Sequence, residues 1–211
     1  MGRISLRARE YSEPLYATVG GEMSAKGVGT GRLEAFSDGV IAVIITILVL
    51  ELKVPPRNGV AGLLAALPTV LLYLLTFVQI GIYWVNHHYL VDEADTVTHG
   101  MFWANLMFLF CLSLFPFAME WIGAKGLSSF TAALYAAVSI LPGVGYMALW
   151  TQIRCTSGGS SQISRGKQVA SLLLYAMAIP AAWYRPSASL ALVAMVAVLW
   201  LLPPKATRRE E

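Results

Sequence analysis

A long apolar segment with one charged residue inside it constrains the fold of this chain more than any other feature. Between Ala35 and Leu50 the sequence AFSDGVIAVIITILVL contains a single charged residue, Asp38. At about 1.5 Å of rise per residue, the segment forms a helix roughly 24 Å long. That length is slightly short of a hydrocarbon core of about 30 Å, which is typical of a membrane helix with a polar end that packs inside a bundle. Asp38 is therefore a candidate functional residue, and a structural ion pair or a carboxylate at a helix N-terminus is the alternative.

The overall composition also indicates a membrane protein. Of the 211 residues, 57% are hydrophobic and 13% are charged, which is far from the usage of soluble domains. The net charge of +3 is too small to indicate binding to nucleic acid. We therefore expect an integral membrane protein that contacts membrane lipid and has no nucleic-acid partner.

Further hydrophobic segments predict five more spans, which makes the fold class an all-α membrane protein with six transmembrane helices and a single repeat. They are expected at residues 63–89, 101–121, 128–151, 168–184 and 187–202. The last two are short, so one re-entrant or tilted hairpin is the alternative for that pair. The predicted domains are a disordered cytosolic tail over residues 1–31, a transmembrane domain over 32–204 and a charged C-terminal tail over 205–211.

The distribution of Lys and Arg predicts the orientation of these spans. Six spans place both termini on one side, together with eleven of the fifteen basic residues: Arg3, Arg7, Arg9, Lys26, Arg32, Arg154, Arg165, Lys167, Lys205, Arg208 and Arg209. The remaining four lie on the opposite side: Lys53, Arg57, Lys125 and Arg185. Because basic residues concentrate in cytoplasmic loops, both termini are expected in the cytoplasm.

One face of the first helix carries a regular stripe. Gly39, Val43, Thr46 or Ile47, and Leu50 follow one another at spacings of three or four residues, which places them along one side of a helix. The stripe either packs against another span or faces something outside the subunit. Thr46 is the one polar residue deep in the span, and its hydroxyl either meets a passing ion or bonds back to the carbonyl of Ala42.

Polar residues gather where the second span ends and the third begins. Trp84-Val-Asn86-His87-His88 closes one span and Trp103-Ala-Asn105 opens the next. The predicted topology brings His87, His88, Trp103 and Asn105 to the same membrane side as Asp38, and polar groups inside a membrane need partners. Adjacent histidines point about 100° apart on a helix, so we expect no metal site. Arg32 and Asp38 lie roughly on opposite faces of their helix, so each is expected to pair with another helix or subunit.

Three motifs together resemble the endolysosomal potassium-channel family and its prokaryotic relatives. They are Arg32-x-x-x-Phe36-Ser37-Asp38, Trp84-x-x-His87-His88, and Trp103-x-Asn105 with the apolar residues that follow it. The resemblance covers roughly residues 32–119. It implies a potassium-selective cation channel of a prokaryotic cell membrane and no enzymatic activity. Potassium is then the permeant ion, transient in the pore, and no other cofactor is expected.

The resemblance also implies an assembly and a pore. Animal members of the family resemble two fused copies of this unit and pair as dimers, whereas this chain carries one signature, which predicts a homotetramer. Val43, Thr46, Ile47 and Leu50 then line an axial pore with an apolar constriction, because family members line the narrowest part with side chains of the first helix. The polar network comprises Arg32, Phe36, Ser37, Asp38, His87, His88, Trp103 and Asn105. A proton-coupled secondary transporter that uses Asp38, His87 and His88 is the alternative, although no internal repeat supports it.

Overall fold

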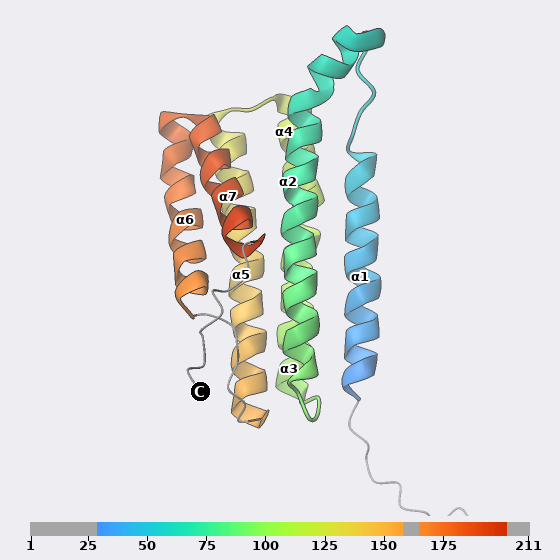
Figure 1. The fold of residues 1–211 in the computed structure, drawn as a ribbon, viewed down its shortest axis with the longest axis vertical. Helices are drawn as coiled ribbons and strands as arrows, with labels where there is room; N and C mark the ends of the chain where they lie inside the picture. Colours follow the sequence, from blue (N-terminus) through green and yellow to red (C-terminus); the bar gives the residue numbers. More distant parts are fainter. Residues whose placement is uncertain (1–28, 158–164, 202–211) are drawn as a thin grey trace, which may run out of the picture.

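The computed structural model describes residues 29–157 and 165–201, and in these ranges every regular element is a helix (Figure 1). The helices are α1 (Thr30–Leu50), α2 (Gly59–Asp92), α3 (His99–Ser113), α4 (Phe115–Lys125), α5 (Ser129–Ser157), α6 (Arg165–Tyr184) and α7 (Pro186–Leu201). The predicted all-α membrane fold is confirmed. Most of the N-terminal tail and the C-terminal tail lie outside the described residues.

Six helical segments correspond to the six predicted spans, because α3 and α4 follow one another as a single span, His99–Lys125. Proline at the first positions of α4 explains the interruption of the helix at Leu114, since proline lacks the N–H that a helix interior needs. Within the described ranges, the helices long and apolar enough to cross a membrane are α1, α2, the α3–α4 segment and α5. The largest boundary error is at the end of α5, predicted at Thr151 and found at Ser157.

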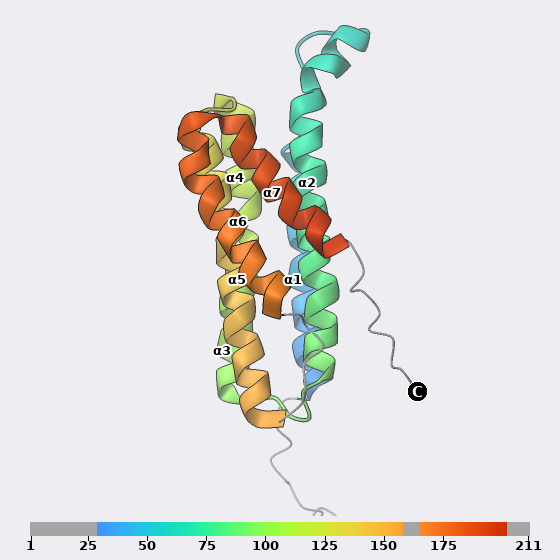
Figure 2. The same cartoon turned by 60° about the vertical axis from the view of Figure 1, so that its left-hand side comes forward.

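The helix pair α6 and α7 forms a hairpin that turns at Arg185. The hairpin packs against α5, and α7 also contacts α2. Figure 2 shows α7 crossing the bundle obliquely and the hairpin ending well short of the lower end of α5. The predicted fifth and sixth helices are thus present and tilted.

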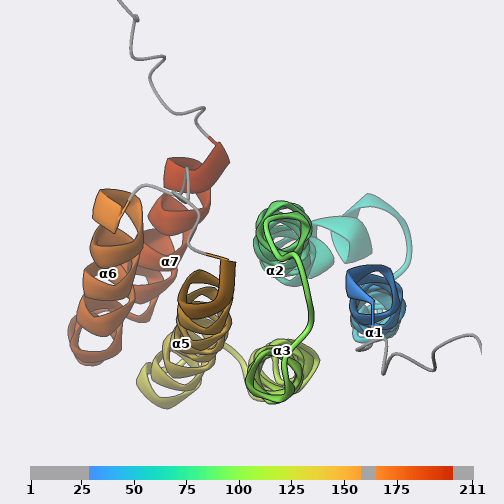
Figure 3. The same ribbon diagram turned by 90° about the horizontal axis from the view of Figure 1, so that it is seen from below.

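Helix α1 lies at the edge of the bundle, where it contacts α2, α3 and α4. Seen along the bundle, α1 is at one side and the α6–α7 hairpin is at the other, with α2, α3 and α5 between them (Figure 3). Large apolar side chains from the central helices fill the core, including Phe108, Phe115 and Tyr135. One face of α1 is therefore packed against its own subunit and the other is left uncovered.

Candidate functional site

Helix α1 has two faces of different character. The residues buried against the subunit are Leu33, Ser37, Ile41, Ile44 and Leu48. Their spacing of three or four residues defines one side of the helix. On the other side, large apolar side chains are uncovered: Val43 is 55% exposed, Ile47 is 43% exposed and Leu50 is 71% exposed. Gly39 and Thr46 are also exposed, so the stripe found in the sequence lies on the uncovered face.

Thr46 bonds to its own helix, but not as predicted. Its Oγ1 donates to the carbonyl oxygen of Val43 at 2.8 Å, rather than to the carbonyl of Ala42. Threonine has two helical rotamers that direct the hydroxyl toward different preceding carbonyls, and the sequence does not select between them. Because the hydroxyl hydrogen is used in this bond, the lone pairs of the Thr46 oxygen remain available on the exposed face.

A buried chain of hydrogen bonds connects α1, α3 and α2. Asn105 Nδ2 on α3 donates to Ser37 Oγ on α1 at 2.9 Å, and Ser37 Oγ donates to the carbonyl of Leu33 at 2.8 Å. Asn105 Oδ1 lies 2.7 Å from His87 Nε2 on α2. Ser37, His87 and Asn105 are fully buried. Since the amide oxygen only accepts, His87 donates from Nε2.

The ring of His87 is held by packing as well as by this bond. It stacks on Phe108 with a centroid distance of 5.4 Å and an interplanar angle of 5°. Its other nitrogen, Nδ1, is buried without a hydrogen-bond partner among the described residues. The ring is therefore fixed in position by α3, which argues for a structural role in joining helices.

Asp38 is bonded to the second helix through a tryptophan. Trp84 Nε1 on α2 donates to Asp38 Oδ1 at 2.7 Å. A hydrogen bond to an ionised carboxylate is stronger than one between neutral groups. This bond fastens α1 to α2 at the residue directly after Ser37, and Arg32 takes no part in it.

A second contact between α1 and α2 involves a residue that the sequence analysis missed. His88 Nδ1 pairs with Glu34 of α1, and His88 Nε2 lies 3.7 Å from Asp92 Oδ2. These three side chains place one ligand atom each within 4.8 Å of one another. Imidazole and carboxylates are ligands that divalent metals use, although exposed carboxylates are common without a metal. Glu34 was missed because its position opposite His88 depends on the register between two helices.

Three residues of the predicted polar network lie outside it. Trp103 is 59% exposed, and its Nε1 donates to His99 of its own helix at 2.8 Å. Within the subunit Trp103 therefore bonds to its own helix and not to Asp38, His87 or Asn105. The sequence indicates the end of the helix at which Trp103 lies, but not the side of the helix that packs inward. Arg32 and Phe36 are exposed on α1, and within the described part of the chain Arg32 forms no ion pair.

A further polar chain runs through the interior of the subunit, away from α1. Thr76 Oγ1 lies 2.7 Å from the Tyr135 hydroxyl, and that hydroxyl donates to Gln79 Oε1 at 2.8 Å. Gln79 Nε2 then donates to the Tyr175 hydroxyl at 3.0 Å. These residues were not predicted from the sequence, although Thr76, Gln79 and Tyr83 recur at helical spacing along one face of the second span.

Comparisons with known proteins agree with this arrangement. The profile of the family described as "Endosomal/lysosomal potassium channel TMEM175" matches residues 32–116. A protein named a potassium channel from Chryseobacterium sp. (strain P1-3) is 41% identical over 83% of this chain and 94% of its own length. A protein from Streptomyces collinus that is also named a potassium channel is 37% identical over 60% of this chain and 66% of its own length.

The chain is also similar to a protein of solved structure and to a human protein. The crystal structure of a lysosomal potassium-selective channel TMEM175 homologue from Chamaesiphon minutus superposes with a TM-score of 0.65 at 27% identity, and covers 82% of this chain and 96% of that one. The human endosomal/lysosomal proton channel TMEM175 is 34% identical over 42% of this chain, which is 20% of the human protein. The chain thus belongs to the TMEM175 family, as its three motifs predict.

Proposed function

We propose that the chain is a subunit of a potassium-selective cation channel in which ions pass along an axial pore lined by α1. The observation that carries the proposal is the uncovered apolar face of α1, on which Val43, Ile47 and Leu50 are exposed. The names of the bacterial relatives and of the structural neighbour support potassium as the permeant ion. The mouse and human relatives are named proton channels, and each matches 101 residues of this chain.

The chemistry of the exposed face fits a narrow pore. Large aliphatic side chains arranged around an axis form a hydrophobic constriction, which gates by excluding water. Thr46 lies within the same stripe and directs a hydroxyl oxygen to the exposed side. That oxygen replaces part of the hydration shell when an ion passes.

A single α1 helix cannot surround a pore, so several subunits are needed around the axis. Identical chains usually form closed rings with cyclic symmetry. A homotetramer places four α1 helices around the axis and covers the apolar side chains of each α1. The subunit lies in the lipid of a prokaryotic cell membrane, with both termini in the cytoplasm.

The polar contacts of α1 take a supporting role in this proposal. Ser37 and Asp38 are bonded to Asn105 and Trp84, and the side chains of both point away from the stripe. They fix the orientation of α1 so that its apolar face is presented to the other subunits. Because these groups are bonded within the subunit, the proton-coupled transporter is not favoured, and the relatives are channels and not enzymes.

Cysteine accessibility tests the proposed pore. Val43→Cys and Leu50→Cys are made in a Cys155→Ser background, because Cys155 is exposed whereas Cys111 is buried. The variants are reconstituted in planar bilayers, and silver ions are applied while potassium current is recorded. Silver is expected to block current in both variants and to leave the background protein unaffected.

A cysteine away from the stripe provides the matched control. Val49 is also exposed on α1 but lies about 100° from Leu50 around the helix. Val49→Cys is expected to conduct normally in the presence of silver. Equal block at all three positions contradicts a pore stripe, and currents insensitive to silver at Val43 and Leu50 place the ion path elsewhere.

A further inference from the structure

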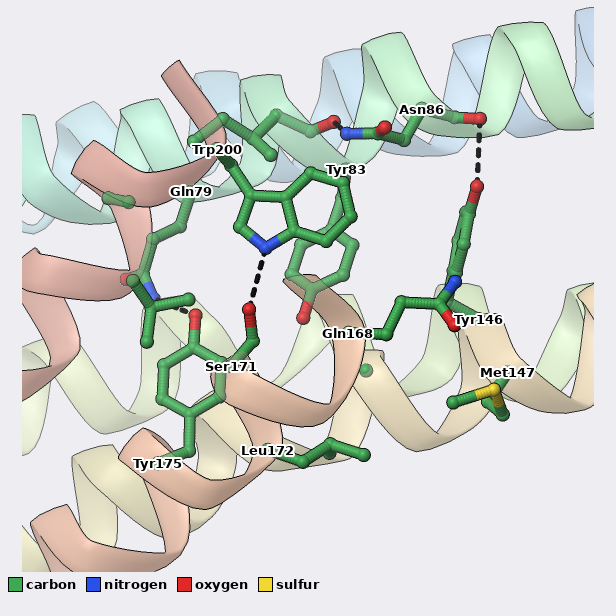
Figure 4. Close-up of a pocket in the computed structure, with 14 residues that line it drawn as sticks. Gln79, Tyr83, Asn86, Tyr146, Met147, Gln168, Ser171, Leu172, Tyr175 and Trp200 are labelled. Atoms are coloured by element: carbon green, nitrogen blue, oxygen red, sulfur yellow. Dashed lines mark hydrogen bonds between the residues drawn. The ribbon is translucent and has the colours of Figure 1, made fainter. Parts of the chain in front are cut away.

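A cavity lies inside the subunit on the side away from α1. It is lined by residues of α2, α5, α6 and α7 and has a volume of about 50 Å³. Figure 4 shows the aromatic rings that surround it, including Tyr83, Tyr146, Tyr175 and Trp200. At roughly 10–15 Å³ for each water-sized group, the cavity accommodates about three to five such groups. Its location between α2 and the α6–α7 hairpin separates it from the proposed pore.

Most polar groups on the cavity wall already have partners. Gln79 bonds to Tyr175 at 3.0 Å, and the Tyr146 hydroxyl donates to the carbonyl of Asn86 at 3.1 Å. Trp200 Nε1 donates to Ser171 Oγ at 2.8 Å. These groups hold the walls together and leave little hydrogen-bonding capacity for an occupant.

Gln168, in contrast, has a polar group without such a partner. It is 7% exposed, and its amide nitrogen has no hydrogen-bond partner among the described residues. Figure 4 places its side chain beside Tyr146 on the edge of the cavity. Because an unpaired buried donor is costly, this amide is suited to an occupant that offers an acceptor oxygen.

The chemistry of the wall defines the class of that occupant. None of the lining residues is charged, so the wall offers no ion-pair partner to an occupant. Apolar and aromatic side chains make up most of the wall, whereas a buried water needs two to four polar partners. An unpaired amide donor in a mostly apolar wall fits a molecule with one oxygen and a short hydrocarbon body.

We propose that this cavity binds a small neutral alcohol of about four or five non-hydrogen atoms, whose oxygen accepts a hydrogen bond from Gln168. The hydroxyl of Tyr83 faces the same space and lies 3.3 Å from the point that a Cβ at Gly143 would occupy. The alkyl part lies against Met147, Leu172 and Val196. The inference concerns binding and does not depend on which ion the channel conducts.

Fluorine NMR of 3-fluoropropan-1-ol with the purified protein in lipid nanodiscs tests the proposal. Empty nanodiscs measure how much of the alcohol partitions into lipid. The additional line broadening in nanodiscs that contain the protein measures binding to the protein. The wild type is expected to show saturable line broadening. Gln168→Leu keeps the volume of the side chain but removes the donor, and is expected to weaken binding about threefold to tenfold.

Two glycine substitutions test whether the alcohol binds in this cavity or elsewhere on the protein. Gly143→Ala adds a methyl group next to Tyr83 and Leu172 and is expected to weaken binding about tenfold, while alanine favours the helix. Gly81→Ala makes the same change on α2, where a Cβ meets no atom within 4 Å, and is expected to bind as the wild type does. A signal no greater than that of empty nanodiscs overturns the proposal, as does equal binding by all four proteins. Potassium current recorded from the same proteins reports the channel function independently.

Discussion

Asn105 joins three helices with one side chain. Its amide donates to Ser37 and accepts from His87, and all three residues are fully buried. Asn105→Leu leaves the buried N–H of His87 without a partner, at a cost of about 1–3 kcal/mol. It also removes the donor to Ser37, whose hydroxyl keeps its own bond to the carbonyl of Leu33. We expect a loss of about 2–4 kcal/mol in stability, measured as earlier thermal unfolding of the purified protein.

A serine on the same helix gives the comparison at this scale. Ser113 is exposed and bonds to the carbonyl of Phe110 within α3, so Ser113→Ala is expected to change stability by less than about 0.5 kcal/mol. Similar losses for Ser113→Ala and Asn105→Leu would show that the buried chain contributes nothing specific.

Asp38 and Trp84 form the other junction between α1 and its subunit. Trp84→Phe removes the indole donor and Asp38→Ala removes the acceptor, and each is expected to destabilise by about 1–2 kcal/mol. Because the two changes break the same bond, the double variant is expected to lose clearly less than the sum. Asp38→Asn keeps an acceptor oxygen and should retain part of the effect.

The same variants separate a structural role from a role in ion permeation. With Asp38 bonded to Trp84, Asp38→Asn is expected to impair assembly or opening more than it alters ion preference. A normal assembly with changed selectivity as its sole defect would instead place Asp38 in the ion path.

At the scale of the helix, α1 packs against its subunit with one face and is proposed to line the pore with the other. Leu50→Ala, Ile47→Ala and Val43→Ala shorten side chains on the uncovered face and leave the buried face intact. A wider constriction lowers the cost of wetting, so unitary potassium conductance or open probability is expected to rise. Val49→Ala changes an exposed residue of the same helix and is expected to do little; equal effects at all four positions would speak against the stripe.

Thr46 contributes a different property to the same element. Thr46→Val keeps the shape of the side chain but removes the oxygen, so the preference for potassium over sodium is expected to fall, measured as a shift in reversal potential under mixed ionic conditions. Thr46→Ser keeps the oxygen and is expected to retain the preference. Loss of preference in both variants would indicate that the methyl group matters instead.

The helices were predictable from the sequence to a greater extent than the side that each helix turns toward its neighbours. The apolar run from Gly39 to Leu50 is local information, and so is the three-to-four-residue spacing of its stripe. The contact of Asn105 with His87 follows from topology, because both lie near the same ends of adjacent spans. Trp103 was placed in the network for the same reason and faces outward. The partners of Asp38 and His88, namely Trp84 and Glu34, depend on the rotation and register of α2 against α1, which no local pattern encodes.

At the scale of the whole molecule, one face of α1 remains without a partner in the single subunit. Val43 and Leu50 are more than half exposed, and Gly39 leaves open space beside its backbone, which allows close approach of a neighbouring helix. We therefore expect four copies to assemble with their α1 helices at the axis, which native mass spectrometry of the protein released from lipid measures directly. Gly39→Leu places a bulky side chain at this contact and is expected to reduce the tetramer fraction. Gly81→Leu on α2, outside the proposed contact, serves as its control. A stable monomer that still conducts potassium would contradict both the tetramer and a pore lined by one helix from each subunit.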